Sequence, residues 1–234
     1  AGGIVAQNTG TIINCGVIGT ISAGASAIET YASVGGIAGY NNGTIANCYS
    51  SIKLFGSTST SYYEYGGSRG YTHVGGIVGV NNKTIINCHS AGDISASAKK
   101  YNNQVYTYAY AGGIVGDNIG TITNCYTTCI STATSDTSAY FGGIAGYSSS
   151  TISNCYFLDN MEKGVGSGTN NTTKCTIEQL TQRSTYIGFD FENDWVWDES
   201  LQSYPCLRGL HYHTYDNSCD KTCNTCGSTR SITH

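Results

Sequence analysis

The residues with the clearest chemical potential are cysteines and histidines near the C-terminal end. Cys219, Cys223 and Cys226 follow the spacing C-x3-C-x2-C, with His213 and His234 on either side. Three thiolates and one imidazole form a tetrahedral zinc site, and C-x2-C followed by Gly is a tight hairpin that lets two sulfurs converge. The spacing predicts a structural zinc ion held by the three cysteines, with His213 or His234 as fourth ligand. A disulfide plus one free or intermolecular thiol is the alternative.

Catalytic constellations are missing from the rest of the sequence. His73 and His89 are isolated, no serine nucleophile elbow is present, and "GGIVG" is not followed by the helix that a phosphate-binding glycine loop needs. The acidic side chains between positions 1 and 155 are scattered along the sequence. Carbohydrate-active β-helices, in contrast, need clustered carboxylates or basic groups on one face. The scattered acids are Glu29, Glu64, Asp93, Asp117 and Asp136. We expect no enzyme, and a carbohydrate-active β-helix is the lowest alternative.

Tyrosine side chains are the candidates for recognition. Two segments, residues 55–73 and 98–111, are rich in Tyr, Ser and Gly, and we expect them to project as loops of unequal length. Aromatic rings stack on sugars and on protein partners at low entropic cost. In the alternative interpretation the tyrosines cover the outer face of strands. The predicted binding residues are Tyr62, Tyr63, Tyr65, Tyr71, Tyr101, Tyr106, Tyr108 and Tyr110.

Charge and hydropathy exclude two classes of partner. Eleven Lys and Arg against fifteen Asp and Glu give a net charge of -4, and the basic residues form no cluster that would neutralise phosphates. We therefore expect no nucleic acid partner. No run of 18 apolar residues predicts a membrane span, and no signal peptide pattern opens the chain. We interpret the chain as processed or trimmed, with any targeting segment outside it.

A block of 13 residues, repeated five times, must position these candidates. Each block starts at the second glycine of a Gly-Gly pair and ends at an Asn-Cys pair 12 residues later. Fixed blocks joined by segments of changing length are typical of a solenoid. The five cysteines that end the blocks are Cys15, Cys48, Cys88, Cys125 and Cys155.

Within a block the hydrophobic period is two, which predicts strand, turn, strand and bend. Isoleucines such as Ile77 and Ile85 recur at two positions of the block and would face inward. One coil cannot bury its own hydrophobic edge, so we expect coils stacked in parallel, with ladders of identical side chains. The fold class is all-β, a parallel β-helix or solenoid of about five coils. The asparagines before the cysteines would form one such ladder at the bend.

The cysteine ladder leaves two redox states open. Neighbouring members would have Cα atoms ~4.8 Å apart, which permits a disulfide. A reduced ladder is the alternative, because free Cys behaves as a small buried hydrophobe. In an extracellular chain we expect some disulfides. Cys129 would supply a partner for one ladder member, and Cys175 with Cys206 is a possible disulfide in the C-terminal part.

The sequence pattern divides the chain into three parts. Residues 1–158 form the solenoid, residues 159–210 a cap that closes its last coil, and residues 211–234 the cysteine-rich module. The cap has a short helical candidate at 176–184, and an open solenoid end needs such a cover. Its apolar bulk would come from Phe189, Phe191, Trp195, Trp197 and Leu207.

The repeat resembles a known family. Residues 75–90 consist of "GGIVG", Val80 and "NNKTIINCHS". This stretch is similar to the GLUG-motif repeat of bacterial surface proteins. The segment 184–210 is similar to the one that often ends such arrays, and the tail resembles short modules of the pattern HxYxxxCxxxCxxCGxxR. Gly-Gly-aliphatic blocks are also similar, more loosely, to chlamydial polymorphic outer-membrane proteins.

This resemblance implies a cell-surface or secreted β-solenoid, often part of large adhesin-like proteins and of some immunoglobulin A-cleaving metallopeptidases. The HExxH zinc signature of those peptidases is absent, so their chemistry does not carry over. We expect an extracellular bacterial scaffold for adhesion or surface assembly, whose partner is a surface glycan, a protein ligand or other copies of itself. The alternative is a subunit that assembles head to tail into a filament or fibre.

Overall fold

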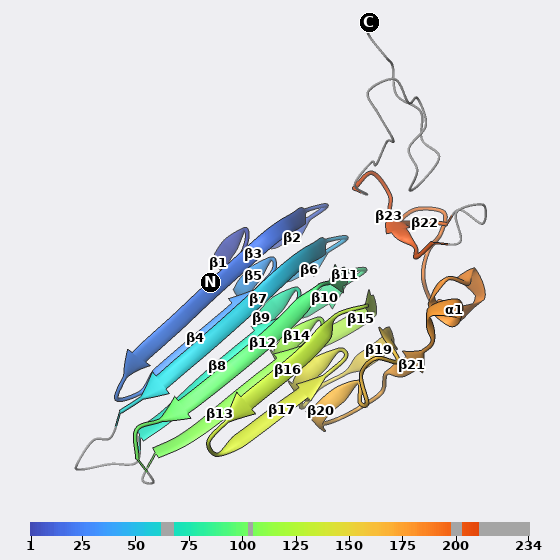
Figure 1. Ribbon diagram of the computed structural model, residues 1–234. Helices are drawn as coiled ribbons and strands as arrows, with labels where there is room; N and C mark the ends of the chain where they lie inside the picture. The colour runs from blue at the N-terminus through green and yellow to red at the C-terminus, as the bar shows by residue number, and fades with distance from the viewer. Residues whose placement is uncertain (62–67, 103–104, 198–202, 211–234) are drawn as a thin grey trace, which may run out of the picture.

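The chain folds into a parallel β-solenoid with a small cap at one side (Figure 1). The structure, a computed structural model, describes residues 1–61, 68–102, 105–197 and 203–210. Strands of successive coils lie one behind the next, from the blue N-terminal coil to the yellow and orange last coils. The all-β parallel solenoid expected from the repeats is therefore confirmed.

The first sheet contains the strand that follows each Gly-Gly pair. It stacks six strands in parallel, slightly more than the five coils expected, because one further strand continues the sheet within residues 159–210. The strands are β1 (Val5–Asn8), β5 (Ala38–Asn41), β9 (Val78–Asn81), β14 (Val115–Asn118), β18 (Ala145–Ser148) and β20 (Val165–Gly168).

The second sheet begins with the short strands that carry the second isoleucine of each block and continues, beyond the Asn-Cys bend, into long strands. Its block strands are β2 (Thr11–Ile13), β6 (Thr44–Ala46), β10 (Thr84–Ile86), β15 (Thr121–Thr127) and β19 (Ile152–Leu158), and β21 (Thr173–Cys175) extends the sheet beyond the last block. Its remaining strands are β3 (Gly16–Ala27), β7 (Tyr49–Thr60), β11 (His89–Ala91), β12 (Asp93–Lys100) and β16 (Ile130–Ser135).

The third sheet returns from the long strands to the next Gly-Gly pair. It consists of β4 (Thr30–Gly35), β8 (Ser68–Gly75), β13 (Val105–Gly112) and β17 (Ser138–Gly142), all parallel. Its strands pack against β3, β7, β12 and β16 of the second sheet, so the first four coils extend into a two-layer arm. The expectation of projecting loops is wrong for most of residues 55–73 and 98–111, which form the ends of β7 and β12 and most of β8 and β13.

The interior of this arm explains why loops were expected. In β7 the burial alternates strictly, with Gly, Ser and Thr among the inward residues. Thr58 Oγ1 lies 2.9 Å from Thr72 Oγ1 of the opposite layer, and Thr30 Oγ1 lies 2.6 Å from Thr60 Oγ1. Because these hydroxyls bond one another, small polar side chains fill a narrow interior at low cost. A composition typical of loops therefore builds a packed arm.

The solenoid body has an aliphatic core formed by the block isoleucines. Ile37, Ile77 and Ile85 have no exposed surface, and Val78 and Cys88 pack against them. The Gly-Gly pairs allow neighbouring coils to approach closely, since a Cβ at Gly76 would overlap the carbonyl oxygen of Gly113. The inward orientation expected from the period of two is present in every coil except the first, where Ile4 is exposed.

Two sets of asparagines stabilise the corners of the coils. The asparagine before each ladder cysteine adopts a left-handed backbone, with φ of 51° at Asn47 and at Asn87, as a tight bend requires. The continuous side-chain ladder lies elsewhere, in the turns that follow the first sheet. There Asn41 Nδ2 donates to Asn81 Oδ1 at 2.9 Å, and Asn81 Nδ2 donates to Asn118 Oδ1 at 2.8 Å.

The cap follows the last coil and covers the bend between the block strands and the long strands. It contains α1 (Ile177–Leu180), a 3-10 turn η1 (Arg183–Thr185) and the antiparallel pair β22 (Trp195–Val196) and β23 (Cys206–Leu207). The helix expected at 176–184 is thus present in shorter form. Residues 159–175, expected to belong to the cap, instead contribute β20 and β21 to the solenoid sheets.

Candidate binding pocket in the cap

The cap is built on a local motif that the sequence specifies. Thr176 and Gln179 form a capping box at the start of α1: Thr176 N–H donates to Gln179 Oε1 at 2.9 Å, and Gln179 N–H donates to Thr176 Oγ1 at 3.2 Å. Such reciprocal bonds satisfy backbone donors that a helix leaves unpaired. The chain then turns through η1 and brings Tyr186 inward, where its hydroxyl donates to the Leu180 carbonyl at 2.7 Å.

An aromatic cluster joins the cap to the solenoid. Trp195 is fully buried and packs 4.7 Å from Phe189 and 5.8 Å from Tyr126, measured between ring centroids. Tyr126 donates its hydroxyl to the Pro205 carbonyl at 2.7 Å, and Ile187 N–H donates to the Tyr156 hydroxyl at 2.9 Å. The cap is therefore anchored to the outer face of the second sheet by rings and by hydrogen bonds.

One carboxylate adds a polar anchor at the same boundary. Asp194 accepts from the side chains of two bend asparagines, Asn47 at 3.1 Å and Asn87 at 2.9 Å. The hydrogen bonds therefore place the cap across at least two coils. Bonds to an ionised acceptor are stronger than neutral ones, so this contact fixes the position of the cap.

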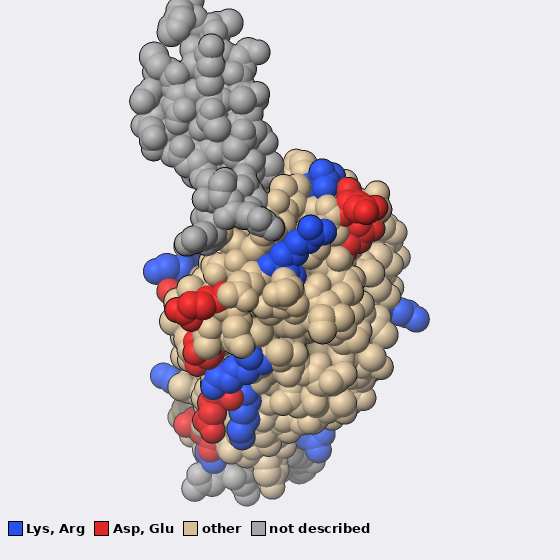
Figure 2. All heavy atoms as spheres, turned by 90° about the vertical axis from the view of Figure 1, so that its right-hand side faces the viewer, with Lys and Arg blue, Asp and Glu red and all other residues tan. Residues whose placement is uncertain are grey.

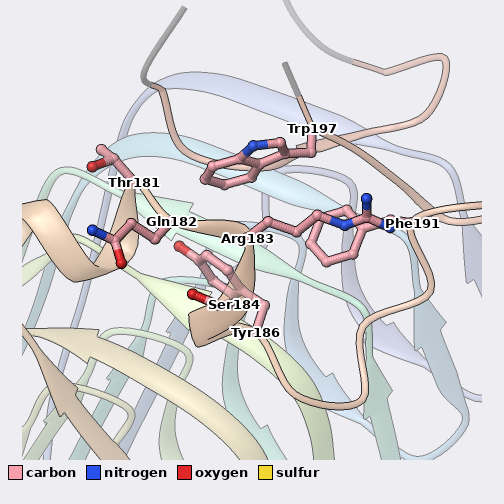
Figure 3. A pocket seen from close by; sticks show the side chains of 7 residues that line it. All are labelled: Thr181, Gln182, Arg183, Ser184, Tyr186, Phe191 and Trp197. Atoms are coloured by element: carbon pink, nitrogen blue, oxygen red, sulfur yellow. The ribbon is translucent and has the colours of Figure 1, made fainter. Parts of the chain in front are cut away.

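A pocket of ≈ 750 Å³ lies on the outer side of the cap (Figure 3). The rings of Trp197, Tyr186 and Phe191 line it together with polar side chains from the segment between α1 and Tyr186. Trp197 lies across the pocket from Gln182 and Tyr186, and the Arg183 side chain runs beneath it toward Phe191. The lining residues are Thr181, Gln182, Arg183, Ser184, Tyr186, Phe191 and Trp197.

The pocket combines half-buried rings with exposed hydrogen-bonding groups. Phe191 and Trp197 are half-buried, while Gln182, Arg183 and Ser184 are exposed. The Arg183 guanidinium lies 4.9 Å from the centroid of the Phe191 ring. Two rings of the wall meet edge to face, Phe191 and Trp197, with centroids 6.2 Å apart. An aromatic wall with convergent polar groups is the usual design of a small-ligand site.

Among the described residues on the face drawn in Figure 2, no continuous area of one charge surrounds the cap. In Figure 2 the positive and negative side chains of this face lie in small groups beside one another, and most of the face is uncharged. No helix in the described part of the chain is long and apolar enough to span a membrane.

The predicted binding tyrosines are arranged as stacked rings on the third sheet. Tyr71 stacks on Tyr31 at 5.3 Å and on Tyr108 at 5.1 Å, and Tyr110 stacks on Tyr140 at 5.5 Å, with interplanar angles of 17° or less. Rings stacked in this way cover one another's faces, whereas a sugar ring needs an open face. The arrangement favours the alternative in which these tyrosines cover the outer face of strands.

The other predicted binding tyrosines do not join these ladders in the same way. Tyr106 lies on β13 and is exposed, and Tyr101, which follows β12, is 83% exposed. Tyr62, Tyr63 and Tyr65 lie outside the described residues. The structure brings none of the described binding tyrosines into the cap pocket.

His73, isolated in the sequence, meets an acid in the structure. Its Nε2 lies 3.8 Å from Asp117 Oδ2, and both side chains are largely buried. Burial lowers the pKa of His73 to about 4 and raises the pKa of Asp117 to about 6. The imidazole is therefore neutral at pH 7, and Tyr110 stacks on it at 5.2 Å. No side-chain partner is present for His73 Nδ1 among the described residues.

The ladder cysteines lie in line across successive coils. Cys125 and Cys155 are register partners, and Cys88 N–H donates to Cys125 Sγ at 3.4 Å. All five are reduced; Cys48, Cys88, Cys125 and Cys155 are buried and Cys15 is half-buried. Burial raises the pKa of the Cys125 thiol and raises the pKa of the Cys129 thiol to about 11. Both thiols therefore remain protonated at pH 7.

The C-terminal disulfide is not formed in the structure. Cys175 is a reduced, buried residue at the end of β21, whereas Cys206 lies in β23 opposite Val196. The predicted zinc ligands Cys219, Cys223, Cys226, His213 and His234 lie outside the described residues. Within the described ranges no group of three or more His, Cys, Asp or Glu side chains is placed to hold a metal ion.

Sequence reasoning missed the polar side of the pocket. Gln182, Arg183 and Ser184 end the helical candidate 176–184 and resemble ordinary surface residues, and Trp197 and Phe191 were expected only as apolar bulk. The capping box Thr176-Gln179 was an available signal, because it fixes where the helix begins and hence where η1 must turn. The return of Trp197 over η1 depends on the tertiary pairing of β22 with β23.

Comparison with known proteins supports the repeat. The family model of the GLUG motif matches residues 30–54, which span β4, β5, β6 and the start of β7. No curated protein and no solved structure matches the chain. The motif therefore corresponds to one coil of the solenoid.

Proposed function

We propose that the protein is an extracellular, non-catalytic scaffold for cell-surface adhesion, and that its cap pocket binds a surface glycan. The observation that carries this proposal is the pocket itself. It places the half-buried ring of Trp197 beside Gln182 and Ser184. Aromatic faces stack on the apolar faces of sugar rings, and amide and hydroxyl groups bond the hydroxyls of a sugar.

The fold supports this role through rigidity. A solenoid whose coils share an aliphatic core and an asparagine ladder holds the cap in one orientation. The Asp194 contacts and the aromatic cluster fix the pocket to that scaffold. A binding site on rigid elements loses less conformational entropy on association than one on free loops.

The geometry of the buried polar groups gives no comparable support to catalysis. His73 and Asp117 are largely buried and lie 3.8 Å apart, and no third carboxylate or cysteine joins them among the described residues. A general acid or base must reach a substrate proton. The scaffold role therefore accounts for more of the structure than a carbohydrate-active enzyme does.

A screen of the full chain on an array of bacterial and host glycans tests the proposal. We expect binding to a defined subset of glycans that is lost in Trp197→Ala, because this change removes the upper wall of the pocket. Tyr101→Ala is a matched control, since Tyr101 is an exposed aromatic residue outside the cap. The absence of binding to any glycan, with the fold intact, would contradict the proposal.

Assembly of several copies through the first coil is a second candidate. β3 pairs with β7 over all twelve of its residues, and no strand within the described ranges pairs with its other edge. Ile18 of this strand is 58% exposed. A long open edge pairs readily with another chain, and head-to-tail stacking gives a fibre. Monodisperse monomers in light scattering and micrographs without fibres would contradict this candidate.

A further inference from the structure

The cap pocket contains a cation whose charge the described protein does not neutralise. Arg183 is exposed and its guanidinium contacts the face of Phe191 at 4.9 Å. Among the described residues no carboxylate forms an ion pair with it, since the ion pairs found there join Lys53 to Asp93 and His73 to Asp117. No acidic side chain is among the described residues that line the pocket.

The other arginine of the cap has a different environment. Arg208 donates to the carbonyl oxygens of Phe191 at 3.1 Å and Trp195 at 3.3 Å, so its guanidinium is part of the cap framework. The Asp190 carboxylate bonds the Asn193 side chain and lies near Arg208, and its pKa is lowered by these groups. Arg183 is therefore the cation that remains available to a ligand in the pocket.

From these contacts we propose that the pocket selects saccharides that carry a carboxylate. This inference rests on the proposed glycan-binding function and specifies its ligand class. The guanidinium of Arg183 presents a planar fork of N–H donors that matches a carboxylate in bidentate geometry. Its position on the Phe191 ring restricts its orientation, so less entropy is lost when the carboxylate binds.

The rest of the lining distinguishes an acidic sugar from a plain carboxylate or an acidic peptide. Gln182 offers donors and an acceptor, and Ser184 offers a hydroxyl that donates and accepts. The Thr181 hydroxyl donates to the Glu178 carbonyl at 3.0 Å and can therefore only accept from a ligand. Sugar hydroxyls likewise donate and accept, and several must be satisfied at once in a closed contact. Trp197 provides a ring against which the apolar face of the sugar packs.

Titration calorimetry with the full chain tests the ligand class. The probes are D-glucuronate and N-acetylneuraminate, with methyl glucoside as the neutral sugar and an acetylated acidic dipeptide as the non-sugar carboxylate. We expect an acidic sugar to bind at least ~10-fold more tightly than methyl glucoside, equivalent to about 1.4 kcal/mol. Added salt should weaken the binding of the acidic sugar and leave the affinity for the neutral sugar unchanged.

Variants of the full chain assign the effect to Arg183. Arg183→Gln should remove the preference for the acidic sugar, and Arg183→Lys should restore part of it, because charge remains and the fork is lost. Arg69→Gln, an exposed arginine on β8 outside the cap, is the control and should change nothing. Circular dichroism of each variant establishes that the fold is retained.

The outcomes separate this inference from the function on which it rests. Equal affinity for acidic and neutral sugars, with binding lost in Trp197→Ala, overturns the acidic class and retains a glycan site. Equal or tighter binding of the dipeptide overturns the saccharide class. If none of the sugars binds and the glycan array is also blank, the proposed function itself fails.

Discussion

Asn87 Nδ2 donates a hydrogen bond to Asp194 Oδ2 at 2.9 Å, although 107 positions separate the two residues in the sequence. Asn87 adopts a left-handed backbone at the bend of one coil, and Asp194 belongs to the cap. The bend residue that closes the coil therefore also orients the cap. This contact connects the architecture of the repeat to the proposed binding site.

Asp194→Ala should loosen the cap without unfolding the solenoid. The change removes the acceptor of both Asn47 and Asn87, and hydrogen bonds to charged groups contribute about 1.5–3 kcal/mol each. We expect faster hydrogen exchange in residues 176–197 and little change in β9 or β14. Glu192→Ala, an exposed acid in the same segment, is the control. Unchanged exchange in the cap of Asp194→Ala would show that this carboxylate does not hold it.

Asn81→Ala should destabilise the solenoid more than Asn8→Ala. Asn81 bonds two ladder neighbours, Asn41 and Asn118, whereas Asn8 bonds one ladder neighbour, Asn41. Because Asn81 is fully buried, its loss leaves neighbouring amides unsatisfied at a cost of about 1–3 kcal/mol per group. Urea unfolding followed by circular dichroism measures the difference. Equal urea midpoints for the two variants would show that the asparagine ladder does not contribute to stability in this way.

The pair His73 and Asp117 should give opposite pH dependences of stability. The folded pKa of His73, about 4, lies below its ordinary value of 6.5, so its contribution is present above pH 6.5 and lost as pH falls through 4. The folded pKa of Asp117, about 6, lies above its ordinary value of 3.8, so its contribution is present below pH 3.8 and lost as pH rises through 6. Between pH 6 and 4 the two effects oppose each other.

Single variants separate these two contributions. Asp117→Asn should lose stability more steeply than the parent chain on acidification from pH 6 to 4, and His73→Gln less steeply. Each difference should reach roughly 2 kcal/mol over the interval, with a slope of at most about 1.4 kcal/mol per pH unit. Urea midpoints measured at half-unit steps provide the curves. Parallel curves for the two variants and the parent would show that neither group titrates as its burial requires.

The cysteine ladder should be reduced and protected in the folded chain. Cys88 and Cys125 have no exposed surface, so a reagent in solution cannot reach either sulfur while the chain is folded. We expect iodoacetamide to modify the half-buried Cys15 first and the other two only after unfolding. Peptide mass spectrometry without reductant reports each site. A Cys88 peptide that stays unmodified after unfolding would indicate a disulfide.

The sequence was sufficient for the solenoid because its evidence is periodic. Ile77 and Ile85 repeat at fixed positions in each block, and their burial follows from stacking. Asn47 and Asn87 also occupy the expected bend, although their side chains reach the cap instead of forming a continuous ladder. Periodic constraints specify backbone conformation, whereas the partner of an outward side chain depends on the cap.

Periodicity did not predict the structure of the segments that join the blocks, nor the location of the binding site. Thr58 and Thr72 belong to a segment whose composition is typical of loops. The segment forms strands, and the hydroxyls of these two residues bond each other across the arm. Tyr71 is aromatic and outward, but its ring is covered by Tyr31 and Tyr108 of neighbouring coils. These outcomes depend on strand register between coils, which composition does not specify.

The most direct test of the proposed function compares two aromatic changes in one glycan-binding assay with the full chain. Trp197→Ala removes a wall of the cap pocket, whereas Tyr71→Ala removes a ring from the stack on the third sheet. The account predicts that Trp197→Ala weakens glycan affinity at least ~10-fold, a loss of about 1.4 kcal/mol, and that Tyr71→Ala leaves it unchanged. Loss of binding in Tyr71→Ala together with full binding in Trp197→Ala would contradict it.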